Sequence, residues 1–372
     1  MSDAEEDTLD EEEQDAQEPV EDASEDDEAG EKEDKGEEKA EGEDKDKEEE
    51  KAEGEKDKGE EKEEEEGEEK EEPEKEEPPP HVPLTEEMLK KGLSLLCKTG
   101  NGLAHAFVKL EVKDKEITDI SILQSFIHLR YVDLSQNALQ DLNALGALTH
   151  LLSLCVDQNQ LSSANGLGEL PYLQKASLAS NNIQNLQGLG HPRLESLNLI
   201  GNKLRTLESL NCIKLYSLHA LELRANQLES TAGLYLPNLR NLYLAQNNLK
   251  TLEGLEHLVS LTSLHLRDNQ LENLDGFSEK MEALQYLNLR GNLVSKLQEV
   301  EKLKVLPMLR ALVLRENPVE EEDGYRLESL IALPNLERLD KDLFEEEERT
   351  EAAETRKARL EEGLNTEQGG GG

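Results

Sequence analysis

Leucines recur in a fixed order along most of this chain, and the polar positions between them recur in the same order. Residues 239–249 read L-x-x-L-x-L-x-x-N-x-L. Side chains alternate along a short strand, so Leu242 and Leu244 are expected to face inward and Tyr243 outward. The amide of Asn247 can pair with backbone groups where the chain leaves the strand. One such unit cannot bury its own leucines, so the pattern predicts a stack of units.

The asparagine position recurs nine times, at intervals of 21 to 25 residues. The nine copies carry Asn137, Asn159, Asn181, Asn202, Asn226, Asn247, Asn269, Asn292 and Asn317. Upstream lies a degenerate copy in which Lys115 replaces the asparagine and the apolar positions are Phe107, Leu110, Val112 and Ile117. A further unit begins at residues 333–339 and then stops. Nine matches in register predict one continuous repeat array over residues 105–340.

The repeat length and the L-x-x-L-x-x-L connectors, as in residues 252–261, resemble the short, intracellular type of leucine-rich repeat. This resemblance implies an α/β fold, a leucine-rich-repeat solenoid. Its parallel β-sheet would line the concave face, and short helical or 3₁₀ connectors would form the convex face.

Residues 81–104 are expected to form a helix that caps the first repeat. Thr85 is a suitable N-cap, followed by acidic residues in the first turn. The helix is expected to extend to about Lys98 and to stop at residues 99–102, which read T-G-N-G. A partner-binding helix is the alternative interpretation. The apolar face that would cover the array carries Leu89, Leu93 and Leu96.

At the other end, residues 325–333 are expected to form the last convex helix. Residues 341–372 are expected to form a charged helix, over 342–362, and a flexible glycine end. Acids fill the first half of that helix and bases the second, which suits the helix dipole. Its apolar stripe is thin, so the helix either packs weakly on the last repeat or projects into solvent. The stripe consists of Leu343, Phe344, Ala352 and Leu360.

Charge divides the chain of 372 residues into two parts. Residues 1–80 carry 44 Asp and Glu against 11 Lys, a net charge of −33, and no aromatic residue. Such a segment cannot bury enough apolar surface to offset its chain entropy, so it is expected to be a disordered acidic tail. The acidic start does not resemble a signal peptide, and no apolar run reaches transmembrane length. We therefore expect a cytoplasmic or nuclear location.

No enzyme motif is present in the sequence. It lacks a P-loop and the patterns G-x-G-x-x-G, G-x-S-x-G and H-E-x-x-H. Its three cysteines form no C-x-x-C pair. His265 is expected to face outward without a Ser or Cys at a matching outward position, which favours a surface contact role. The sequence thus predicts no catalytic residue, no cofactor and no metal site.

The outward positions of the C-terminal half are rich in arginine and aromatic residues, the types enriched at binding hot spots. Glu222, Asp268 and Glu316 lie nearby, so the alternative is that these arginines are solubilising charges with acidic partners. The candidate partner-binding residues are Arg224, Tyr243, His265, Arg267, Tyr286, Arg290, Arg310 and Arg315.

The net charge of −44 repels phosphate at a distance and disfavours nucleic acid as the partner of this surface. An acidic protein or helix fits the arginines better, and the chain's own acidic segment is a second candidate. No membrane or small-molecule substrate is expected.

Residues 94–105, 128–134, 242–247, 264–269 and 336–340 resemble a family of leucine-rich-repeat proteins of the ciliary axoneme, associated with radial spokes. The resemblance covers about 84–348. It implies a structural role in assembling radial spoke heads of motile cilia and sperm flagella, with spoke head proteins as partners.

Two alternatives stay open. One is a phosphatase-regulating scaffold of the same repeat type. The other is an acidic nuclear histone-binding protein, although in that family the acidic segment follows the repeats.

Deletion of residues 1–80 is expected to leave the melting temperature nearly unchanged, because this segment has almost no apolar side chains to bury. Thermal denaturation of the full and the shortened chain, followed by circular dichroism, tests this expectation. A drop of many degrees would contradict it.

Overall fold

The computed structural model describes residues 80–100 and 102–369. Contacts divide the chain into two units, Met1–Glu74 and Lys75–Gly372, and all described residues belong to the second. The predicted disordered tail therefore lies outside the described residues except for Pro80, and so do residues 370–372 of the predicted flexible end.

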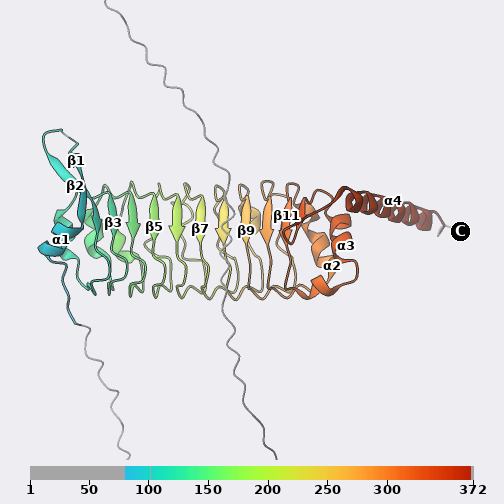
Figure 1. Ribbon diagram of the computed structural model, residues 1–372, viewed down its shortest axis with the longest axis horizontal. Coiled ribbons are helices and arrows are strands. Elements are labelled where there is room, and N and C mark those ends of the chain that lie inside the picture. The colour runs from blue at the N-terminus through green and yellow to red at the C-terminus, as the bar shows by residue number, and fades with distance from the viewer. Residues whose placement is uncertain (1–79, 101, 370–372) are drawn as a thin grey trace, which may run out of the picture. The chain divides into compact units, whose positions relative to one another are not determined.

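Within the described residues, thirteen strands form one open sheet in sequence order (Figure 1). From β2 (His105–Glu111) to β12 (Arg338–Leu339) neighbouring strands are parallel. The strands at the two ends, β1 (Leu93–Lys98) and β13 (Asp342–Leu343), pair antiparallel. The strands between are β3 (Tyr131–Asp133), β4 (Ser153–Cys155), β5 (Lys175–Ser177), β6 (Ser196–Asn198), β7 (Ala220–Glu222), β8 (Asn241–Tyr243), β9 (Ser263–His265), β10 (Tyr286–Asn288) and β11 (Ala311–Val313).

Short helices and 3₁₀ turns connect the strands, as the repeat pattern predicts. The helices are α2 (Leu297–Glu301) and α3 (Tyr325–Ala332), and α3 confirms the predicted last connector helix. Leu242 and Leu244 are fully buried, while Tyr243 between them is half-buried on the outer side of the sheet. The 3₁₀ turns are Ser121–Ser125, Asn143–Ala147, Asn165–Leu167, Leu255–His257, Lys302–Val305 and Pro318–Glu321. The predicted leucine-rich-repeat solenoid is confirmed.

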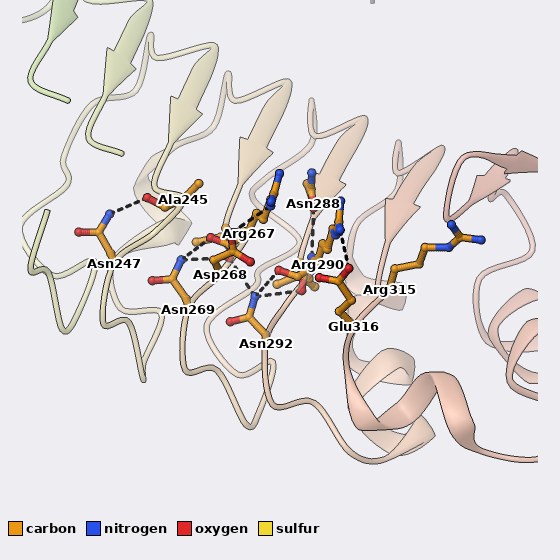
Figure 2. A network of polar contacts seen from close by, with 12 residues as sticks. Ala245, Asn247, Arg267, Asp268, Asn269, Asn288, Arg290, Asn292, Arg315 and Glu316 are labelled. Atoms are coloured by element: carbon orange, nitrogen blue, oxygen red, sulfur yellow. Dashed lines mark hydrogen bonds and ion pairs between the residues drawn. The ribbon is translucent and has the colours of Figure 1, made fainter. Parts of the chain in front are cut away.

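Each repeat asparagine ties its own repeat to the preceding one. Asn247 Nδ2 donates to the carbonyl oxygens of Leu244 (3.1 Å) and Ala245 (3.2 Å) in its own repeat. It also donates to Leu223 (3.0 Å) one repeat earlier, and its Oδ1 accepts from the backbone N–H of Leu228 at 3.1 Å. Figure 2 shows this row of asparagines side by side. The predicted pairing of backbone groups thus also links neighbouring repeats.

The predicted capping helix is too long. Thr85 does cap α1 (Glu86–Gly92), since its Oγ1 accepts from the N–H of Met88 at 3.3 Å. The helix ends at Gly92, where the chain passes so close to Glu111 that a Cβ would lie 2.5 Å from its carbonyl oxygen. The next residues form β1, which pairs with β2 in a hairpin closed by Thr99 N–H donating to Ala104 O.

This hairpin also corrects the predicted apolar face of the cap. Leu89 is buried and Leu93 is half-buried against the core. Leu96 instead pairs with Phe107 across the hairpin and is 59% exposed. The end of the array is therefore covered by a short helix and an added strand.

At the C-terminal end, Asp340 stops the array. Its Oδ1 accepts from the backbone N–H groups of Leu314 (2.6 Å) and Arg315 (2.9 Å), which continue past β11. Its Oδ2 accepts from the hydroxyl of Tyr325 at 2.7 Å. Burial and the Asp340 carboxylate both raise the pKa of Tyr325. A carboxylate thus replaces the backbone partners that another repeat would supply.

The charged C-terminal helix α4 (Glu346–Gly369) begins later than predicted, because Asp342–Leu343 form β13. Of the two alternatives for this helix, the structure shows packing on the array. Glu348 pairs with Arg326 of α3, Arg359 pairs with Glu328 at 2.6 Å, and Ala352 is buried. Leu360 is exposed, so α4 packs less closely on the array at this residue.

Leu244→Ala is expected to lower the free energy of unfolding by about 2–5 kcal/mol, because it leaves a cavity between stacked repeats. Asn247→Ala is expected to cost about 1–3 kcal/mol, because it leaves buried backbone groups of two repeats without partners. Denaturant unfolding measures both effects, with the exposed Lys250→Ala as the matched control. Wild-type stability of Leu244→Ala would contradict the register.

Candidate functional site

The strand register brings most of the predicted partner-binding residues together. Glu222, Tyr243, His265 and Asn288 occupy one column across β7 to β10. Tyr286 lies in the neighbouring column, where it pairs with Ser263. The next outward column, one residue beyond the buried leucine that follows each strand, holds Arg224, Arg267, Arg290 and Arg315, which we call the arginine column.

Tyr243, His265 and Tyr286 form an aromatic ladder across three neighbouring strands. The ring centroids of Tyr243 and His265 are 4.6 Å apart and nearly parallel, and those of His265 and Tyr286 are 5.0 Å apart and tilted. Asn288 Nδ2 donates to the Tyr286 hydroxyl at 3.4 Å. The rings therefore present one half-buried apolar surface with polar atoms at its border.

His265 is neutral near pH 7. Burial, and secondarily the positive charge of Arg224, lowers its pKa from 6.5 to about 4. Its Nε2 lies 3.1 Å from Ser263 Oγ, so the expectation that no outward serine stands near this histidine is wrong. Alternation along β9 places residues 263 and 265 on the same side, a signal the sequence did carry. A ring with this pKa is a weak general base at neutral pH.

Three of the predicted arginines are already paired with carboxylates of the array. Arg267 Nε lies 3.0 Å from Asp268, and Arg310 Nη1 lies 3.2 Å from Glu337. Arg290 pairs with Glu316, which raises the pKa of the guanidinium and lowers the pKa of the carboxyl. These contacts favour the alternative of internally balanced charge for Arg267, Arg290 and Arg310.

Arg224 and Arg315 differ from the other arginines. Both are exposed, and within the part of the chain that the structure describes neither forms an ion pair. In Figure 2 the side chain of Arg315 extends away from the Arg290–Glu316 pair. Burial raises the pKa of Glu222, which the charge of Arg224 partly opposes. The two guanidinium groups lie on either side of the aromatic ladder, in the repeats of β7 and β11.

The N-terminal half of the strand face is organised differently. Lys113 pairs with Asp133 at 2.6 Å, and Asp133 also accepts from the hydroxyl of Ser135. Asp157 accepts from Ser177 at 2.7 Å and from the N–H of Ala179. These carboxylates and their donors satisfy one another, so this half offers fewer unsatisfied charges to a partner.

Residues 80–100 and 102–369 contain no group of three or more His, Cys, Asp or Glu side chains placed to hold a metal ion. None of the helices in these ranges is long and apolar enough to cross a membrane.

Comparisons with known proteins place the chain among leucine-rich-repeat proteins. A family model described as leucine-rich repeat matches residues 238–367. The solved leucine-rich-repeat ectodomain of the Arabidopsis thaliana receptor kinase GASSHO1/SCHENGEN3 is 27% identical, with 61% of this chain and 28% of that chain covered and a TM-score of 0.49.

Two curated relatives cover most of the array. Leucine-rich repeat-containing protein 23 of Xenopus tropicalis is 79% identical over 285 residues, which span 77% of this chain and 81% of the relative. The Homo sapiens protein of the same name is 58% identical over 280 residues, 75% of this chain and 81% of the relative. Leucine-rich-repeat families and folds are typical of non-enzymatic protein-binding scaffolds. The chain belongs to the leucine-rich repeat-containing protein 23 family.

Proposed function

We propose that this protein is an axonemal scaffold that helps to assemble radial spoke heads, and that the C-terminal half of its strand face binds an acidic spoke head protein. The axonemal role is supported by the sequence resemblance described above. The binding face is supported by one observation, the aromatic ladder with Arg224 and Arg315 on either side of it.

Arg224 and Arg315 are the expected contacts to the partner, because neither charge is balanced by an ion pair among the described residues. Their repeats are four strand steps apart, about 19 Å at about 4.8 Å per step. A guanidinium group binds a carboxylate in a bidentate manner, and an aromatic surface contributes apolar contact. The face therefore fits a partner with an apolar centre and carboxylates on both sides of it.

The charges of Arg224 and Arg315 also help to judge the two alternative functions, histone binding and phosphatase regulation. Histones are strongly basic, so exposed arginines on this face would repel one. The face contains no feature specific to a phosphatase. The proposed location, in the axoneme of cilia and flagella, follows from the resemblance alone.

Arg224→Glu/Arg315→Glu is expected to reduce recovery of spoke head proteins from ciliary extract at least about tenfold, since both residues flank the contact centre. Arg267→Glu/Arg290→Glu is expected to have a smaller effect, because both arginines already have carboxylate partners. Quantitative pull-down with the folded proteins measures recovery, and added salt should weaken it.

The matched control for these variants is Lys203→Glu/Lys250→Glu, which reverses two exposed charges outside the strand columns. Equal recovery of the same spoke proteins by the Arg224/Arg315 variant and by this control would show that the strand face is not the binding site.

The proposed location has its own test. After detergent extraction of sperm flagella, we expect the protein to stay with the axonemal pellet and to leave it together with spoke head proteins when salt is raised. Quantitative immunoblots of pellet and supernatant measure the distribution. Complete release by detergent alone would contradict an axonemal scaffold.

A further inference from the structure

A groove separate from the strand face lies at the C-terminal end of the array, where α4 packs beside α3. One cavity of about 380 Å³ opens between Leu330 of α3, Pro334 and helix α4. A second, of about 180 Å³, continues past Pro334 to Leu306 and Leu309. Because both are lined by Pro334 and Arg356, they form one groove, which we call the C-terminal groove.

Helix α4 contributes one face to this groove. The lining positions follow helical spacing of three and four residues, which places them on a single side of α4. Ala352 and Ala353 have short side chains, so this side of α4 leaves open space above Leu330. The lining residues of α4 are Arg349, Ala352, Ala353, Arg356, Lys357 and Leu360.

The charge of the groove is opposite to that of the chain. Four cations line it, and neither cavity has an Asp or Glu in its lining, although the chain carries a net charge of −44. Arg349 donates to the carbonyl of Leu336 at 3.0 Å and helps to hold α4. Lys304, Arg356 and Lys357 are exposed, and none forms an ion pair with another described residue. A basic rim above an apolar floor is therefore left for a partner.

We propose that the C-terminal groove binds an acidic amphipathic helix of another protein. The apolar face of such a helix would lie on Leu306, Leu330 and Pro334 and against the exposed side chain of Leu360. Its carboxylates would pair with Lys304, Arg356 and Lys357 along the rim. Charge complementarity favours an acidic helix, because the four cations in the groove would repel a basic one.

This site does not depend on the strand-face proposal. Its residues come from α3, α4 and the segments around Leu306 and Pro334, and none of them belongs to the arginine column or the aromatic ladder. The signal in the sequence was the helical spacing of Arg349, Arg356 and Lys357. The sequence predicts that the bases of α4 suit the helix dipole, but the helix extends to Gly369 and has no base in its last turn.

The test uses the full chain and a fluorescent helical peptide of about 20 residues, with leucines at i, i+3, i+4 and i+7 and glutamates elsewhere. Fluorescence anisotropy is expected to show saturable binding that weakens as salt rises to about 0.5 M. Arg356→Glu/Lys357→Glu should weaken binding at least about tenfold, and so should Leu360→Asp, which changes an exposed apolar side chain.

Three controls make the test decisive. The strand-face variant Arg224→Glu/Arg315→Glu should bind the peptide like wild type, which separates this proposal from the proposed function. A scrambled peptide of equal composition, without an apolar stripe, should bind much more weakly. Melting temperatures of all variants should match the wild type, since the changed side chains are exposed at the surface.

Equal binding of the scrambled peptide would mean attraction by charge alone and would overturn the proposal. So would an unchanged affinity of the Arg356/Lys357 variant. Phosphatidylserine vesicles are the third probe: vesicle binding that the same variant abolishes, with no peptide binding, would assign the groove to a lipid surface and reject a protein helix.

Discussion

The fold depends on the side-chain amide of one asparagine per repeat. It donates to carbonyl groups of two successive repeats and accepts from an N–H of the earlier one, where strand pairing has ended and the backbone is buried. Burial of the leucines drives the stacking, but other apolar side chains of similar size could supply the same buried area. The amide sets the register of each repeat on the one before it, and therefore the columns on the strand face.

Those columns decide what the face can bind. Asp268 follows Arg267 in the chain, and the register places Glu316 beside Arg290, so part of the arginine column is balanced within the array. The charge left for a partner lies on Arg224 and Arg315, and the aromatic ladder between them supplies apolar area. A count of arginines would overstate the cationic character of this face, because a paired guanidinium gains little from a second carboxylate.

The first and the last repeat of the array each have one side without a neighbouring repeat, and the two are covered in different ways. At the first repeat, a hairpin adds an antiparallel strand, and Gly92 lets α1 approach Glu111 closely. At the last repeat, Asp340 satisfies the final N–H groups and α4 packs on α3 through ion pairs at Glu348 and Arg359. Because α4 covers the end with small side chains, the C-terminal groove stays open beside it.

The sequence by itself determined the array: the number of complete repeats, the buried leucines, the role of Asn247 and the outward residues of each strand. These follow from a local period repeated many times, so each copy confirms the register of the others. Only the tertiary structure decided the hairpin after Gly92, the docking of α4 and the pairing of Arg290 with Glu316. Each of these occurs once, outside the period or between side chains of different columns or repeats. Their outcome depends on distances that the stacked repeats create and that no local pattern encodes.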